Sequence, residues 1–321
     1  MNHIFLSVAS SPHIKDKRST RSIMLDVLIA LFPAVLMSLV YFGNRALWHY
    51  VLGIAVAVLS EYLWNHFMKK PQTIHDLSAA VTGCLLAMNV SPLTPVWVTA
   101  LGAVFAIIIV KMIFGGIGQN FINPALAARA FMMASWPVYM TTFTNQLGPD
   151  AVAGPTLLSA LRQGLEPGIG VRELLLGHPG GCLGETSALA LLIGAAYLIF
   201  RRVIRWEPPL IYMLVAAGLC TLFAPDGLLQ GNFLIQLFSG GLVLGACFMA
   251  NDYSTSPMTR RGEIYYALGC AFLTFVIRRF GGYPEGVSYS ILIMNLFVPL
   301  IDRWTIPVTF GKEARRGKKE A

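Results

Sequence analysis

Long apolar blocks dominate this chain of 321 residues and leave few folds open to it. An apolar helix needs roughly 20 residues to cross the hydrocarbon layer of a bilayer. Blocks of this kind predict ten spans, at residues 23–42, 47–67, 76–90, 93–114, 123–140, 185–204, 209–225, 231–250, 263–280 and 285–302. The sequence therefore predicts an all-α integral membrane protein with about ten transmembrane helices.

The composition supports this fold class and excludes several functions. Charged residues make up 12% of the chain, about half of the roughly 25% that is usual in soluble proteins. The mean hydropathy of +0.63 also argues against a cytosolic enzyme with one soluble core. The net charge of +8 does not indicate nucleic-acid binding, because the basic residues stand at the ends of apolar blocks. The five Cys include no CxxC pair, so we predict no metal site.

The placement of the basic residues predicts the orientation in the membrane. With the N-terminus inside, seventeen of the 24 Lys and Arg fall in cytoplasmic segments and five fall outside. Lys111 and Arg129 fall within spans. This asymmetry follows the positive-inside rule. We therefore expect both termini in the cytoplasm and the long connection 141–184 on the outer side.

A five-span unit occurs twice in the sequence. Residues 84–92 (CLLAMNVSP) are similar to residues 247–257 (CFMANDYSTSP), at an offset of 163. Glycine pairs follow at 115–116 and 281–282, at an offset of 166. An odd number of spans per unit inverts the second copy in the membrane, and such repeats build sites near the midplane from interrupted helices. Chance similarity between Gly-rich apolar helices is the alternative.

The repeat divides the chain into five parts. We expect a cytoplasmic N-terminal segment (1–22), a first five-helix repeat (23–140), an extracytoplasmic loop (141–184), a second five-helix repeat (185–302) and a basic cytoplasmic tail (303–321).

Polar residues within the spans mark a candidate interior site. Arg129 lies in the fifth span, and Asn120 and Asn123 lie close to it in sequence. Charges inside a membrane are costly and commonly functional, so these three residues form a possible cofactor site in which Arg129 faces a flavin, a phosphate or a carboxylate. A structural pair between helices, or a side chain that reaches the interface, is the alternative. Cys84 and Cys247 occupy matching repeat positions, which small packing residues explain better than a metal pair.

The connection 141–184 is long enough to be functional. It contains PDAVAGPTLLSALRQG at 149–164, in which Thr156 precedes an amphipathic helical stretch that starts at Leu157. The simplest role for Thr156 is that of a helix N-cap, and spacing alone says no more.

Five separated segments give the chain a family resemblance. They are residues 10–34, 118–132 (GQNFINPALAARAFM), 181–199 (GCLGETSALALLIGAAYLI), 248–259 (FMANDYSTSPMT) and 280–302. The chain resembles the D-subunit family of Rnf-type ion-translocating ferredoxin:NAD oxidoreductase complexes. It resembles the B subunit of the sodium-pumping NADH:quinone reductase more distantly. The likeness covers essentially the whole chain.

The resemblance implies a covalent flavin in the outer loop. In that family, a separate flavin transferase attaches flavin mononucleotide (FMN) to a Thr through its phosphate, in a motif of the form Asp-x-x-Ser/Thr-Gly-Ala-Thr. Asp150, Gly154 and Thr156 match this motif. Ala153 and Pro155 depart from it. The implied attachment site is Thr156, and a non-covalent riboflavin is also implied without a position.

The resemblance further implies an electron relay coupled to Na⁺ or H⁺ movement. The implied partners are the other membrane and peripheral subunits of the complex, including an extracytoplasmic flavoprotein subunit, and no nucleic acid. The chain would lie in the cytoplasmic membrane of a bacterium or archaeon and would have no complete activity alone. A rival hypothesis is a stand-alone channel or secondary transporter for a small solute, which the inverted repeat suits equally well. Such a transporter would not need the Asp150–Thr156 motif.

Overall fold

The computed structural model describes residues 18–144, 153–154, 157–162, 170–177, 180–224, 227–228, 231–282 and 285–307. These residues are mostly helical. The first half of the chain forms α1 (Thr20–Phe42), α2 (Asn44–Phe67), the 3-10 turn η1 (Ile74–Asp76), α3 (Ser78–Met88), α4 (Val96–Val104), the π-helix η2 (Phe105–Met112), α5 (Pro124–Ser135) and α6 (Pro137–Thr141).

Short elements follow, and then a second set of helices. The short elements are β1 (Phe143–Thr144), β2 (Ala153–Gly154), α7 (Leu157–Arg162), α8 (Val171–Leu176) and the 3-10 turn η3 (Leu183–Glu185). The second set comprises α9 (Ala188–Phe200), α10 (Glu207–Leu222), β3 (Phe223–Ala224), β4 (Gly227–Leu228), α11 (Phe233–Phe238), α12 (Leu242–Leu244), the π-helix η4 (Gly245–Met249), α13 (Arg260–Phe280) and α14 (Val287–Thr305).

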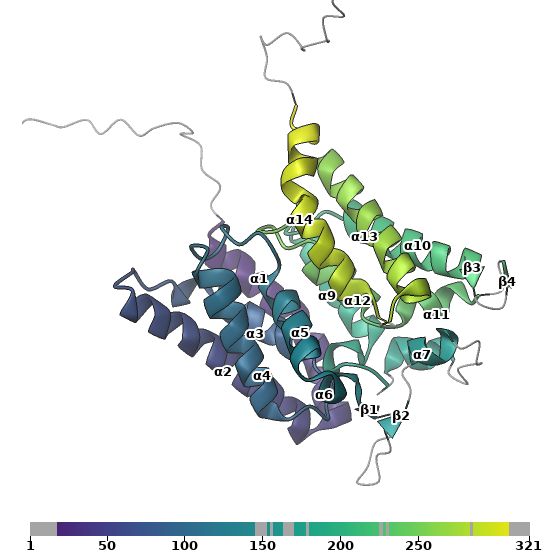
Figure 1. The fold of residues 1–321 in the computed structure, drawn as a ribbon, viewed down its shortest axis with the longest axis horizontal. Coiled ribbons are helices and arrows are strands. Elements are labelled where there is room, and N and C mark those ends of the chain that lie inside the picture. The colour runs from purple at the N-terminus through teal and green to yellow at the C-terminus, as the bar shows by residue number, and fades with distance from the viewer. Residues whose placement is uncertain are drawn as a thin grey trace, which may run out of the picture.

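The helices form two neighbouring groups, one from each half of the chain (Figure 1). Within the first group, α2 packs against α3 and α4. Within the second group, α13 packs against both α10 and α14. The groups meet where α1 packs against α9 and where α5 packs against α14. The start of α1 and the end of α14 lie on one side of the molecule, and β1, β2 and α7 lie on the other (Figure 1).

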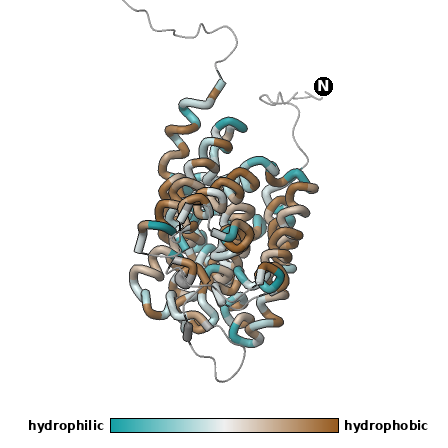
Figure 2. Tube along the Cα trace, turned by 90° about the vertical axis from the view of Figure 1, so that its right-hand side faces the viewer, coloured by the Kyte–Doolittle hydropathy of each residue, from teal (hydrophilic) through white to brown (hydrophobic). Residues whose placement is uncertain are grey.

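The outward and inward faces of the helices differ as a lipid surrounding requires. Along α1, the side chains of Leu25, Ile29, Phe32, Leu36 and Val40 are exposed, and they recur every three to four residues on one face. The buried residues of α1 include the small or polar Asp26, Ala30, Ala34 and Ser38, together with Met24 and Leu31. Large apolar side chains that face outward along a whole helix would be poorly placed in water. Figure 2 shows hydrophobic residues along most of the helices.

Two of the described helices, α1 and α2, are long and apolar enough to cross a membrane by length and composition. Shorter apolar helices lie at Ser78–Met88, Val96–Met112, Ala188–Phe200 and Glu207–Leu222. Each of the ten segments expected from the sequence contains helix. Three segments are built from more than one piece: η2 continues α4, Trp136 separates α5 from α6, and residues 239–241 separate α11 from α12, which η4 continues.

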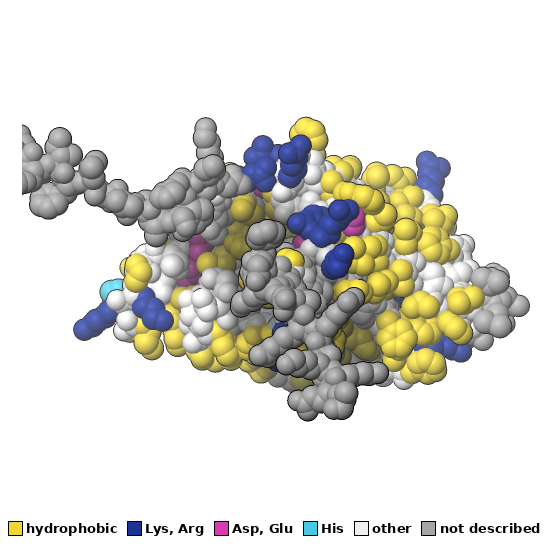
Figure 3. Space-filling model, turned by 90° about the horizontal axis from the view of Figure 1, so that it is seen from above, with side chains coloured by type: hydrophobic (Ala, Val, Ile, Leu, Met, Phe, Trp, Pro, Cys, Tyr) yellow, Lys and Arg dark blue, Asp and Glu magenta, His cyan; other side chains and the backbone are white. Residues whose placement is uncertain are grey.

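The connection 141–184 is described only in pieces. β1 pairs antiparallel with β2, with Phe143 opposite Gly154 and Thr144 opposite Ala153. A helix starts at Leu157, as the sequence predicted. The opposite side of the molecule is seen in Figure 3, where Lys and Arg side chains stand out between hydrophobic flanks.

Candidate functional site

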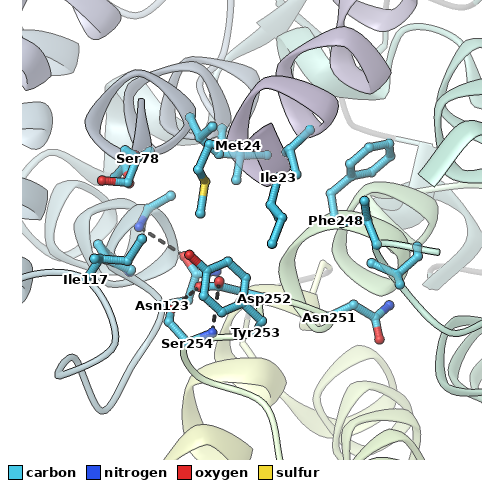
Figure 4. Close-up of a pocket in the computed structure, with 18 of the residues that line it drawn as sticks. Ile23, Met24, Ser78, Ile117, Asn123, Phe248, Asn251, Asp252, Tyr253 and Ser254 are labelled. Carbon is cyan, nitrogen blue, oxygen red and sulfur yellow. Dashed lines mark hydrogen bonds between the residues drawn. The ribbon is translucent and has the colours of Figure 1, made fainter. Parts of the chain in front are cut away.

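A cavity of about 80 Å³ lies where the two halves of the chain meet. The first half supplies Ile23, Met24, Val27, Ser78, Val81, Thr82, Leu85, Lys111, Ile117, Asn120, Asn123, Pro124 and Ala125. The second half supplies Leu198, Val203, Ile204, Cys247, Phe248, Asn251, Asp252, Tyr253 and Ser254. We call this space the Asn120 cavity (Figure 4).

The Asn120 side chain offers an unused acceptor in the cavity. Asn120 is 6% exposed. Its Nδ2 donates to Ser254 Oγ at 3.4 Å, whereas its Oδ1 is buried without a partner. An unpaired buried carbonyl oxygen costs free energy that a bound donor would recover. The cavity therefore presents an acceptor that suits an N–H group of a ligand.

Asn123 shapes the cavity by starting α5. Its Oδ1 accepts from the backbone N–H groups of Ala125 at 3.0 Å and Leu126 at 3.3 Å. Asn is a favoured N-cap, and Pro124 suits the first helical position because it has no N–H to leave unpaired. Asn123 Nδ2 donates to the carbonyl oxygen of Met249 in η4 at 3.3 Å. Asn123 thus joins the start of α5 to the helix break of the second half.

A second wall carries a buried lysine. Lys111 is 3% exposed and lies in η2. Its ammonium donates to Glu61 Oε2 at 2.7 Å and to Ser78 Oγ at 2.6 Å. Ser78 in turn donates to Asp76 Oδ1 at 2.6 Å. Since π-helical turns occur frequently at functional sites, the position of Lys111 in one draws attention to this wall.

The loop after η4 supplies the facing wall. Asp252 accepts from the Ser254 hydroxyl at 2.8 Å and from the Ser254 N–H at 3.3 Å. Burial raises the pKa of the Asp252 carboxyl, while the hydrogen bonds from Ser254 and Thr255 and the charge of Lys111 oppose this shift. Tyr253 lies beside Asp252 and, with Phe248, gives the cavity aromatic surface (Figure 4). The arrangement suits a flat heteroaromatic ligand with apolar faces and a polar edge.

Arg129 does not line this cavity but forms a separate network. It is 4% exposed. Its Nη1 donates to Asn89 Oδ1 and to Ser288 Oγ, each at 2.9 Å. Its Nη2 donates to Cys182 Sγ at 3.6 Å and forms an ion pair with Glu285. The sequence grouped Arg129 with Asn120 and Asn123 as one possible site, whereas the structure places the two asparagines on the cavity and Arg129 apart from it.

One group of side chains beside Arg129 has the composition of a metal site. Cys182, Glu185 and Glu285 bring their ligand atoms within 4.8 Å of one another. Arg129 already contacts Cys182 and Glu285. A guanidinium in contact with two of the three groups opposes a metal cation there, so these groups serve first as its partners.

The predicted attachment motif is described only in part. Gly154 lies in β2 opposite Phe143. Asp150 and Thr156 lie outside the described residues. Residues 157–162 form α7, which begins directly after Thr156 in the sequence.

Several residues of the cavity were not among the predicted site residues. Lys111 was recognised as a charge within a span, but nothing in the sequence pairs it with Glu61. Asp252, Tyr253 and Ser254 belong to the interrupted segment NDYSTSP, which marked a helix break without assigning it a ligand. A charge in one span that pairs with a charge in another is the signal that would have found Lys111.

Comparisons with known proteins agree over the whole chain. Residues 7–311 match the model of the NQR2, RnfD, RnfE family. The chain is 47% identical to the D subunit of the Na(+)-translocating ferredoxin:NAD(+) oxidoreductase complex of Acetobacterium woodii, over 100% of this chain and 99% of that protein. It is 42% identical to the D subunit of the proton-translocating ferredoxin:NAD(+) oxidoreductase complex of Clostridium ljungdahlii, over 95% and 96% of the two chains. It is 37% identical to the D subunit of the ion-translocating oxidoreductase complex of Stutzerimonas stutzeri, over 93% and 94%.

Proposed function

Because this chain belongs to the NQR2, RnfD, RnfE family, we propose that it is the D subunit of an ion-translocating ferredoxin:NAD oxidoreductase complex. The observation that carries this proposal is the full-length similarity to subunits of that name. In this role the chain passes electrons between cofactors of neighbouring subunits and couples their passage to cation movement. It works within the assembled complex, in the cytoplasmic membrane, with both termini in the cytoplasm.

Thr156 is the proposed point of covalent FMN attachment. The support is the motif, in which Asp150, Gly154 and Thr156 match the acceptor pattern of the family. A separate flavin transferase would join the FMN phosphate to the Thr156 hydroxyl. The charge count supports an extracytoplasmic position for this loop, where an extracytoplasmic flavoprotein subunit is the expected electron-transfer partner.

The redox role has a direct activity test. In membranes that contain the complex, Thr156→Val should abolish ferredoxin-dependent NAD reduction, because one electron carrier is missing from the relay. Gly218→Ala is a suitable control, since a Cβ at Gly218 would meet no atom within 4 Å. Full activity in the Thr156→Val complex would contradict the proposal.

The Asn120 cavity is the proposed site of a non-covalent flavin. The unpartnered Asn120 Oδ1 fits the N–H edge of an isoalloxazine ring, and the apolar side chains fit its faces. When bound, the flavin supplies the electron-carrying chemistry. The chain binds it through Asn120, orients it between the two halves and excludes lipid and water with Met24, Ile117 and Phe248.

Occupancy of the cavity can be measured directly. Asn120→Leu removes the free acceptor at similar size, so riboflavin recovered from the purified complex should fall, by up to about tenfold in affinity for one lost hydrogen bond. Thr274→Val is the control, because its hydroxyl is buried against Tyr212 and Ser290 and does not line the cavity. Equal riboflavin content in both variants and the parent would place the flavin elsewhere.

Inverted repeats are the proposed architecture around this cavity. Support comes from the element positions: α5 begins at residue 124 and α14 at residue 287, which is 163 residues later. The helix breaks after Met88 and Met249 each bring an asparagine, Asn89 and Asn251, to the end of an interrupted helix. The relatives are named for Na⁺ in one case and for protons in another, and the similarity does not choose between these ions.

A further inference from the structure

In the buried ion pair of Lys111 and Glu61, the lysine lies on the side of the Asn120 cavity. Lys111 lines the cavity, as does its hydrogen-bond partner Ser78. Glu61 is 0% exposed and lies on α2, and it is not among the lining residues. The positive end of the pair therefore faces the cavity, with the negative end behind it.

The ammonium is held as a cation by the groups around it. Glu61 Oε2 and Ser78 Oγ accept from it at 2.7 and 2.6 Å. Glu61 is itself fixed by the Thr73 hydroxyl, which also accepts from Asn65 Nδ2 at 3.0 Å. A buried ammonium is tolerated when it is paired and hydrogen-bonded in this way.

Among the described residues that line the cavity, Lys111 is the one with a basic side chain. The facing wall carries Asp252. The cavity thus lies between a cation from the first half of the chain and a carboxyl group from the second. Charges act over longer distances here than in water, because the surroundings screen them weakly.

We propose that Lys111 sets the reduction potential of the flavin in the Asn120 cavity. This inference rests on the proposed function. An electron that enters the ring from a neighbouring carrier of the complex adds negative charge, and the same electron leaves to the next carrier. The charge of Lys111, paired with Glu61, changes the free energy of the reduced ring relative to the oxidised ring, and its side chain takes no part in bond formation.

The test compares charge removal with charge conservation. The double variant Glu61→Gln/Lys111→Gln removes both charges together, so that neither is left buried and unpaired. Lys111→Arg keeps the cation. Thr274→Val is a buried control away from the cavity. All are made in the Thr156→Val background, in which the covalent FMN of this chain would be absent. The flavins of the other subunits are the same in every variant, so a difference between a variant and the Thr156→Val parent reports the flavin in the cavity.

The readout is the midpoint potential of the bound flavin in the purified complex, from spectroelectrochemical titration. The double variant should have a more negative potential, by at least a tenfold change in the equilibrium between reduced and oxidised flavin, which is about 59 mV for a one-electron couple. Lys111→Arg and Thr274→Val should stay near the parent. If the double variant loses flavin, riboflavin is added back before the titration.

Two results would overturn the role of Lys111: an unchanged potential in the double variant, or an equal shift in Lys111→Arg. Absence of any non-covalent flavin from the Thr156→Val parent would instead contradict the proposed flavin site itself. The two failures are therefore distinguishable.

Discussion

A single buried arginine ties together the elements around the break in the first half. Arg129 on α5 reaches Asn89 after α3, Cys182 before η3, and Glu285 and Ser288 at the start of α14. Its Nη groups are fully engaged with these partners, while its Nε is buried without one. The guanidinium therefore fixes the relative positions of helices from both halves of the chain.

Removing this guanidinium should lower the free energy of unfolding. Arg129→Met leaves the partly buried Glu285, whose side chain is 13% exposed, without its ion-pair partner. The loss of one partner from a buried pair costs about 3–5 kcal/mol. The melting temperature in detergent should fall clearly. Arg129→Met/Glu285→Met removes both charges and should recover most of the loss. Equal stability of the single variant and the parent would show that the ion pair does not stabilise the fold.

The sequence predicted some of these residues but not their grouping. Asn120, Asn123 and Arg129 are neighbours in the sequence, and each is buried and polar as expected. Arg129 lies six residues after the N-cap Asn123, which at 1.5 Å per residue is about 9 Å along α5. That distance takes its side chain away from the cavity and into a different set of partners. The partners come from distant parts of the chain, so sequence spacing could not identify them.

At the scale of helices, close backbone contacts depend on glycine. A Cβ at Gly83 on α3 would lie 2.5 Å from the carbonyl oxygen of Gly53 on α2. A Cβ at Gly194 on α9 would collide with the carbonyl oxygen of Ala30 on α1. Small residues at helix interfaces allow this close approach, which contributes strongly to packing inside membranes.

The contact between α1 and α9 can be tested at Gly194. Gly194→Ala forces α9 away from α1, and overpacking of this kind costs about 1–3 kcal/mol. Its melting temperature should fall. Gly218→Ala on α10 is matched in chemistry but meets no atom within 4 Å, so it should be neutral or stabilise by up to about 1 kcal/mol through its higher helix propensity. Equal behaviour of the two variants would show that the helices do not touch as described.

Hydropathy predicted the helical segments well, because block length and composition determine which stretches can be buried in lipid. It did not predict how the segments are interrupted. The π-helices η2 and η4 depend on hydrogen bonds such as Ala250 N–H to the Gly245 carbonyl oxygen, which close five residues apart. The break at residues 239–241 depends on the positive φ angles of Gly240 and Gly241. Such local conformations follow from packing between the two halves of the chain. A hydropathy pattern carries no information about that packing.

At the scale of the whole molecule, the Asn120 cavity exists because the two halves meet. Neither half alone supplies both Lys111 and Asp252, or both Asn120 and Ser254. A ligand held there contacts both groups of helices, so its charge can influence how they pack. The proposed function places the coupling of electron transfer to cation movement here, since a ligand shifts a conformational equilibrium only through contacts that differ between the states.

We propose that this chain carries a covalent flavin as a working electron carrier, and fluorescence of the denatured chain measures that flavin. The chain is co-expressed with a flavin transferase, purified, denatured and run on a gel, which removes every non-covalent flavin. We predict a fluorescent band for the parent and a dark band for Thr156→Val, with equal amounts of protein in both. A dark parent band, or a Thr156→Val band as bright as the parent, would contradict the account.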